Sequence, residues 1–134
     1  MSEGYSEEVY KHFRSPQNVG KIESPSAIGK VGNPQCGDIM YIYIKVNDET
    51  KIIEDCKFQT FGCAAAIASS SVATELIKGK TIFEAFKITN ENVIKALGSL
   101  PERKIHCSLL AEEGIKKAIL EYCSEKNIDP LVSD

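Results

Sequence analysis

Residues 38–61 read DIMYIYIKVNDETKIIEDCKFQTF, and two alternating patterns with a polar break between them decide the expected fold. From Asp38 to Val46, every second side chain is apolar on one face, which is the period of a β-strand. Residues 52–61 repeat the alternation, with Asp55, Lys57 and Gln59 on a wet face. The break at residues 47–50, Asn-Asp-Glu-Thr, has turn chemistry. The stretch therefore predicts an antiparallel β-hairpin.

Helical patterns follow the hairpin. Residues 63–78 are rich in Ala and Ser, with apolar positions at helical spacing and Gly79 as a stop. Short helices are expected over residues 81–86, capped by Thr81, and up to Leu97, capped by Thr89 or Asn90. The last helix is expected over about residues 107–126, with an apolar stripe on one side and charged residues on the other.

The region before the hairpin is less regular. Ser6 can cap a short helix over residues 7–13. Residues 15–37 are rich in Ser, Pro, Gly and Asn, and the apolar pair at Ala27 and Ile28 fits either an extended arm or an edge strand.

These elements predict an α+β fold: a small antiparallel sheet of about three strands, covered on one face by helices, with a long C-terminal helix. A chain of 134 residues is expected to form one domain, residues 1–134, with a core that needs no disulfides. An N-terminal arm and helix (about 1–20) and a frayed tail (about 127–134) are expected at its ends.

Composition narrows the function classes. The net charge is −3 and the 16 basic residues are scattered, which argues against nucleic-acid binding. The N-terminus is acidic without an apolar core, unlike a secretory signal, and no apolar run approaches the ~20 residues that span a bilayer. The chain is expected to be cytoplasmic, or a matrix protein if a presequence has been removed, and not to bind membranes.

Five cysteines are present, and their odd number in a reducing compartment argues against a disulfide framework. Cys56 lies on the expected core face of a strand and is interpreted as a packing residue. Cys123, beside the stripe of the last helix, is interpreted as packing or as an incidental surface thiol. Three cysteines at element boundaries remain: Cys36, Cys63 and Cys107.

The hairpin brings two of these cysteines together. Cys36 precedes the first strand and Cys63 follows the second, and in an antiparallel hairpin those two points lie at the same end. Asp38 is two residues from Cys36, on the same side of the chain. If the last helix starts at that end, His106 and Cys107 complete the group at a loop-to-helix junction that is reachable from solvent.

The three thiols, one carboxylate and one imidazole of this set are all groups that can bind a metal ion. Thiolates select zinc, Cu(I) or iron–sulfur clusters, and three Cys with one further ligand suit tetrahedral zinc or one edge of a cluster. No CxxC pair is present, so each Cys alone is also compatible with simple packing. A nucleophile–base pair of Cys107 and His106 is disfavoured because consecutive side chains point apart.

Five motifs carry a resemblance that spans nearly the whole chain, in order and with compatible spacing. They are GNPQCGD (32–38), FGCAAAIASSS (61–71), IHCS (105–108), YSEEVYKHF (5–13) and PQNVG (16–20). Together they resemble the IscU/NifU-type iron–sulfur cluster assembly scaffolds, and the single-domain IscU branch in particular.

The resemblance implies a carrier rather than a turnover enzyme. On such scaffolds a [2Fe–2S] cluster, sometimes [4Fe–4S], is built from iron and persulfide sulfur supplied by an IscS-like cysteine desulfurase, then passed to apo-proteins. By similarity Cys36, Cys63 and Cys107 hold iron, and Asp38 or His106 takes the fourth position. Asp38 would keep the cluster labile, and Cys107 would accept the persulfide. Lys104 matches a near-site lysine, and Tyr5 a tyrosine linked to self-association as a homodimer.

Further partners implied by the resemblance are a frataxin-like protein, a ferredoxin and Hsp70/J-type chaperones. The chaperone-binding segment of the family usually reads Leu-Pro-Pro, whereas Glu102 replaces the second proline here, which argues against chaperone binding. After Cys63 the family usually has Gly, and this chain has Ala64.

The alternative is a SufU-like sulfurtransferase, in which bound Zn2+ occupies the site and Cys107 accepts sulfur from the desulfurase. That branch carries an insertion before its last Cys and lacks the His. His106 and the absence of an evident insertion favour the IscU branch. A structural zinc module without any transfer role is the third hypothesis.

Overall fold

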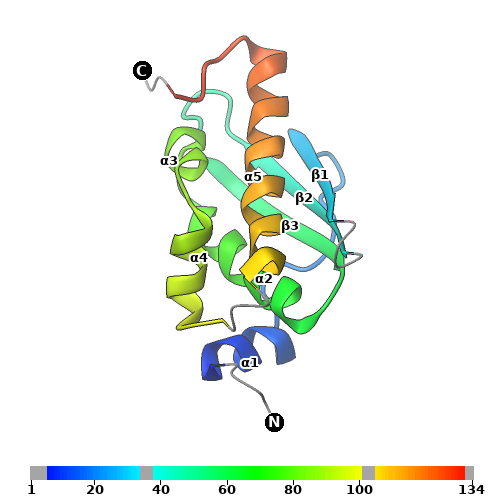
Figure 1. Cartoon of the computed structure of the whole chain (residues 1–134). Helices are drawn as coiled ribbons and strands as arrows, with labels where there is room; N and C mark the ends of the chain where they lie inside the picture. The colour runs from blue at the N-terminus through cyan, green and yellow to red at the C-terminus, as the bar shows by residue number, and fades with distance from the viewer. Residues whose placement is uncertain (1–5, 34–37, 101–104, 132–134) are drawn as a thin grey trace.

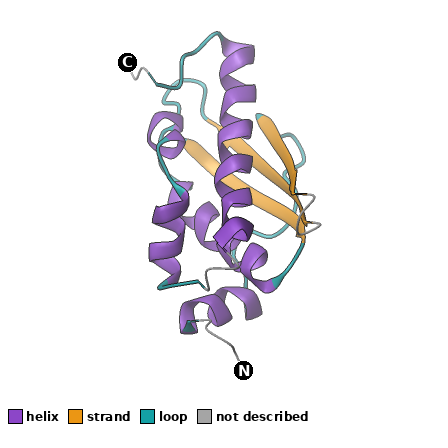
Figure 2. Ribbon diagram, in the orientation of Figure 1, coloured by secondary structure: helices purple, strands orange, loops and turns teal. Residues whose placement is uncertain are grey.

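A computed structural model of the chain describes residues 6–33, 38–100 and 105–131, and for Asn33, Asp38 and His106 it describes the backbone but not the side chain. Tyr5, Cys36 and Lys104 lie outside the described residues. Within them, helices gather on one face of an antiparallel sheet, and a long helix crosses that face (Figures 1 and 2). The predicted α+β fold is therefore confirmed.

The sheet has the strand order β1-β2-β3, formed by β1 (Ala27–Asn33), β2 (Asp38–Val46) and β3 (Ile53–Phe61). β2 has the predicted bounds, and its apolar face at Met40, Ile42, Ile44 and Val46 is buried. β1 resolves the alternative left open by the sequence, because it is an edge strand rather than an arm. Ile39 pairs with Phe61, so the start of β2 lies beside the end of β3.

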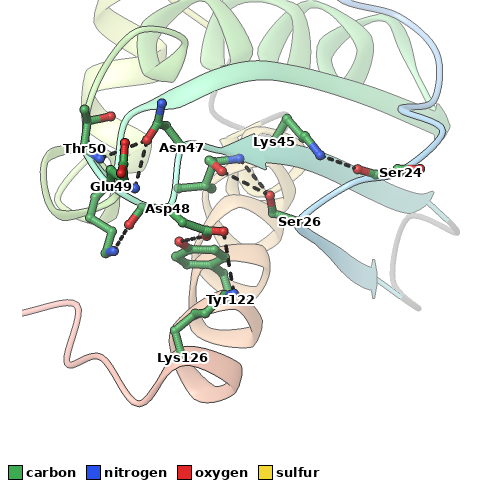
Figure 3. Close-up of polar contacts among 11 residues, drawn as sticks. Ser24, Ser26, Lys45, Asn47, Asp48, Glu49, Thr50, Tyr122 and Lys126 are labelled. Carbon is green, nitrogen blue, oxygen red and sulfur yellow. Dashed lines mark hydrogen bonds and ion pairs between the residues drawn. The ribbon is translucent and has the colours of Figure 1, made fainter.

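The turn at the other end of the hairpin is built by Asn47, whose Oδ1 accepts hydrogen bonds from the backbone N of Glu49 (2.8 Å) and Thr50 (3.0 Å). Its second residue, Asp48, accepts a 2.6 Å hydrogen bond from the buried Tyr122 hydroxyl (Figure 3). That hydrogen bond lowers the pKa of Asp48, while burial, and then the same bond, raises the pKa of Tyr122. The contact attaches the hairpin turn to the last helix.

The helices have the bounds α1 (Glu7–Arg14), α2 (Ala64–Ile77), α3 (Ile82–Phe86), α4 (Asn90–Leu97) and α5 (Ile105–Lys126). Ser6, Thr81 and Thr89 cap α1, α3 and α4 through their side-chain oxygens, and Thr81 and Thr89 form capping boxes. α5 begins at Ile105, two residues before the predicted start at Cys107. No helix within the described ranges has the length and apolar character that crossing a bilayer requires.

α5 lies close against the sheet at a contact between two glycines. A Cβ on Gly29 of β1 would come within 2.1 Å of the Gly114 carbonyl oxygen and 2.7 Å of the Ala118 backbone N. A Cβ on Gly114 would come within 2.7 Å of Ile42 Cγ1. Because neither glycine has a Cβ, helix and strand backbones approach to a separation that any other residue pair would prevent.

The segment after α1 is held by a buried polar row on α2. Ser71 Oγ lies 2.6 Å from His12 Nδ1 and accepts a 2.8 Å bond from the backbone N of Gln17. Asn18 bonds Thr74 (3.1 Å) and accepts a hydrogen bond from Phe58 N through its own carbonyl (2.9 Å). The row therefore places residues 17–20 along the edge of β3, next to the second half of α2.

Candidate functional site

Cys63 occupies the junction between β3 and α2. It is the N-cap residue of α2, with an extended backbone (φ −79°, ψ 174°), and its side chain makes no capping hydrogen bond. A side chain that does not cap its own helix is available to a partner elsewhere. Cys63 is half-buried, so solvent reaches this side of the site.

Cys107 is the third residue of α5 and only 1% exposed. Two expectations are corrected here: Cys107 does not open the helix, and its side chain is not reachable from solvent. It packs in a small apolar cluster with Ala65 and Ala66 of α2, bordered by Cys63 and Leu100. The small Ala side chains let the first turn of α5 approach α2, which buries the sulfur.

The two sulfur atoms meet between the starts of α2 and α5, with Cys63 Sγ 3.4 Å from Cys107 Sγ. A disulfide bond would bring them to about 2.05 Å. Two thiolates bound to one tetrahedral metal at about 2.3 Å lie about 3.8 Å from each other. The observed separation is therefore near that of two ligands of a single metal ion. The apolar cluster would cover such an ion on the Cys107 side, while solvent reaches the Cys63 side.

The other predicted ligands are described only in part. The backbone of Asp38 lies at this end of the sheet, because its neighbour Ile39 pairs with Phe61, two residues before Cys63. The side chains of Asp38 and His106 lie outside the described part of the chain, as does all of Cys36. Among the side chains that are described, no group of three or more His, Cys, Asp or Glu gathers as a metal site would require.

Cys56 and Cys123 are separate from this pair and are both buried in the main core. Burial raises the pKa of both thiols, which keeps them protonated and unreactive. The packing interpretation of Cys56 is confirmed, and of the two alternatives for Cys123 the structure favours packing over a surface thiol.

Sequence reasoning missed the polar residues that surround the start of α5. Ser108, directly after Cys107, is fully buried, and its hydroxyl contacts the Asn90 side chain and the Ile105 carbonyl oxygen (2.7 Å). Glu112, one turn further along, accepts a hydrogen bond from the backbone N of Asn90. A Ser next to a candidate ligand and an Asn at a helix start were visible signals, but neither reveals that the two meet.

Comparison with known proteins identifies the family. The model of the NifU-like N-terminal domain matches residues 4–129 of this chain. The chain belongs to this family. Its similarity to individual NifU-like proteins is also extensive: it is 61% identical over 118 residues to the iron-sulfur cluster assembly scaffold protein IscU 1 of Archaeoglobus fulgidus, covering 88% of this chain and 76% of that protein.

Two further relatives extend the range of organisms. The scaffold protein IscU of Aquifex aeolicus is 48% identical over 91% of this chain and 78% of its own length. The iron sulfur cluster assembly protein 1, mitochondrial, of Debaryomyces hansenii is 52% identical over 92% of this chain and 70% of its own length.

Solved NifU-like structures have the same fold. A putative iron-sulfur cluster assembly scaffold protein for the SUF system from Fervidobacterium islandicum superposes with a TM-score of 0.71 at 28% identity, over 86% of this chain and 96% of that one. The N-terminal part of a NifU-like protein from Brucella abortus superposes with a TM-score of 0.72 at 20% identity, over 90% and 94%. The latter supports the fold alone.

Proposed function

We infer that this protein is a scaffold on which an iron–sulfur cluster is assembled and from which it is passed to recipient proteins. The observation that carries the inference is the pair of sulfur atoms 3.4 Å apart at the starts of two helices. Relatives that are 48–61% identical are named as iron–sulfur cluster assembly scaffolds, and we therefore take such a cluster as the cargo of this protein. As a scaffold, the protein binds and releases its cargo, so it is a carrier rather than an enzyme.

The proposed ligands are Cys36, Cys63 and Cys107, with Asp38 or His106 in the fourth position. Cys36 is two residues from Asp38, so covalent geometry keeps the two Cα atoms within about 8 Å. The Asp38 backbone in turn lies at the end of the sheet next to Cys63. Three thiolates suit an iron–sulfur cluster or zinc. The proposed cargo is a [2Fe–2S] cluster, with [4Fe–4S] and Zn2+ as alternative occupants.

Sulfur delivery is proposed to proceed by persulfide transfer from a cysteine desulfurase. The Cys107 thiolate attacks the outer sulfur of the desulfurase persulfide, a new S–S bond forms at Cys107, and the desulfurase cysteine leaves as a thiolate. Cys107 is buried beneath the half-exposed Cys63, so this role requires the first turn of α5 to open. Of the two cysteines of the site that the structure describes, Cys63 is the more exposed and so the one that an incoming persulfide reaches first.

Anaerobic reconstitution tests the proposed function. Ferrous iron and sulfide, added to protein purified without air, should produce visible sulfur-to-iron charge-transfer absorption at stoichiometric iron content. The absorption should disappear on chelation and should be transferable to an apo-ferredoxin. A colourless protein that keeps one zinc ion throughout would instead support the zinc-bound sulfur acceptor and refute the scaffold.

The proposed role of Asp38 gives a separate prediction. Oxygen ligands hold iron less firmly than thiolates, so Asp38→Ala should lengthen the half-time of cluster loss to a chelator, followed by the decay of visible absorption. Asp55→Ala is the control, because Asp55 lies on β3 in an ion pair with Lys78 (3.4 Å). Cluster loss from Asp38→Ala as fast as from the wild type, or faster, would contradict the role.

A further inference from the structure

A partly buried polar contact joins the first turn of α4 to the first two turns of α5. Its members are Asn90, Ser108 and Glu112, here called the α4–α5 clamp. The Asn90 carboxamide contacts Ser108 Oγ, and the Asn90 backbone N–H donates to Glu112 Oε1. Ser108 is fully buried, and Glu112 also pairs with Lys116 at 3.1 Å.

The Ser108 hydroxyl is the donor in both of its hydrogen bonds. Ser108 carries one hydroxyl hydrogen, yet its oxygen contacts both the Ile105 carbonyl (2.7 Å) and the Asn90 carboxamide. The single hydroxyl hydrogen is therefore shared between two acceptors, the Asn90 Oδ1 and the Ile105 carbonyl oxygen. Asn90 makes two hydrogen bonds with α5: its backbone N–H donates to Glu112, and its side-chain oxygen accepts from Ser108.

The clamp contacts α5 on a different side from the sulfur site. Cys107 and Ser108 are consecutive in the helix, so their side chains point about 100° apart around its axis. Cys107 faces Ala65 and Ala66, whose apolar contacts tolerate rotation because apolar attraction has no preferred direction. The hydrogen bonds of the clamp are directional, and the buried Ser108 hydroxyl has no water to replace them.

We propose that Asn90 and Ser108 are positioning residues for Cys107, which set the rotation of the first turn of α5 so that Cys107 Sγ lies beside Cys63 Sγ. The inference rests on the proposed function, in that it assigns Cys107 to a metal-binding thiolate. It adds two residues that are not themselves among the proposed metal ligands.

The test uses Asn90→Ala, Ser108→Ala and the double variant, with Tyr122→Phe as the matched control. Tyr122→Phe also removes one partly buried hydrogen bond of α5, the one to Asp48, but at the opposite end of the helix (Figure 3). Asn90 is half-exposed and Ser108→Ala removes a single oxygen atom, so both variants are expected to fold. Urea denaturation of all four variants measures their stability.

The readout is anaerobic titration with Co(II), whose thiolate charge-transfer and ligand-field bands report the geometry of the site. Each single variant should bind Co(II) about tenfold more weakly and with shifted bands, as is typical when support of a ligand is removed. The double variant should bind Co(II) no more weakly than whichever single variant has the lower affinity, because both substitutions remove the same hydrogen bond between Asn90 and Ser108. Tyr122→Phe should bind Co(II) as the wild type does.

Three outcomes would overturn the proposal: unchanged Co(II) binding in both Asn90→Ala and Ser108→Ala, an equal loss in Tyr122→Phe, or a wild type that does not bind Co(II). Failure of this proposal about Asn90 and Ser108 is distinguishable from failure of the proposed scaffold function. Co(II) binding depends on the placement of thiolates, whereas iron and sulfide reconstitution of the wild type tests the cargo.

Discussion

Gly29→Ala is expected to destabilise the folded protein by about 3 kcal/mol, the upper part of the usual range for overpacking a core. The new Cβ would lie 2.1 Å from the Gly114 carbonyl oxygen and 2.7 Å from the Ala118 backbone N. Both atoms belong to the backbone of α5, so no side-chain rotation relieves the clash and the helix itself must move. Urea denaturation measures the effect.

The matched control is Gly79→Ala. Gly79 has φ +90°, and a Cβ added to it would meet no atom within 4 Å, so its replacement adds backbone strain of about 1 kcal/mol without a clash. Gly114→Ala should fall between the two, because its Cβ meets a side-chain atom of Ile42 that can shift. A Gly29→Ala variant no less stable than Gly79→Ala would show that α5 does not lie as close to β1 as described.

Cys63→Ala and Cys107→Ala are each expected to abolish retention of the reconstituted cluster. The two sulfurs are 3.4 Å apart, so removing either breaks this pair and leaves two of the three proposed thiolate ligands. The apolar cluster around Cys107 offers no described replacement ligand, since its other members are Ala65, Ala66 and Leu100. Iron and sulfide content after gel filtration, together with visible absorption, measures the loss.

Cys123→Ala is the control for this pair. Cys123 is also a buried cysteine of α5, 2% exposed, but it lies in the main core near the other end of the helix. The variant should keep its cluster while losing some stability through the cavity it leaves. A full cluster in Cys107→Ala, or loss of the cluster in Cys123→Ala, would place the binding site elsewhere.

Much of the fold could be predicted because its signals are local. The alternation of β2 gave its bounds to the residue, and the caps at Ser6, Thr81 and Thr89 marked three helix starts. Alternation follows from the pleat of a strand, and a cap follows from unpaired N–H groups at a helix start. Both depend on residues within a few positions of each other.

β1 was predicted only as one of two alternatives, for a reason that the structure makes clear. Its third residue, Gly29, has no side chain to contribute to an alternating pattern, because α5 occupies the place of a Cβ. The isolated Gly114 inside a helical pattern was the matching signal. Neither glycine indicates its partner from sequence alone.

The sequence by itself determined the hairpin and the helices that follow it, the caps at Ser6 and Thr81, and that Cys63 lies where a strand turns into a helix. Tertiary structure alone decided that Cys107 is buried, that its sulfur lies 3.4 Å from that of Cys63, and that Asn90 meets Ser108. The partners in these contacts are 44 and 18 residues apart. Backbone periodicity acts over a few residues, whereas the separation of two sulfur atoms depends on how whole helices pack against one another and against the sheet.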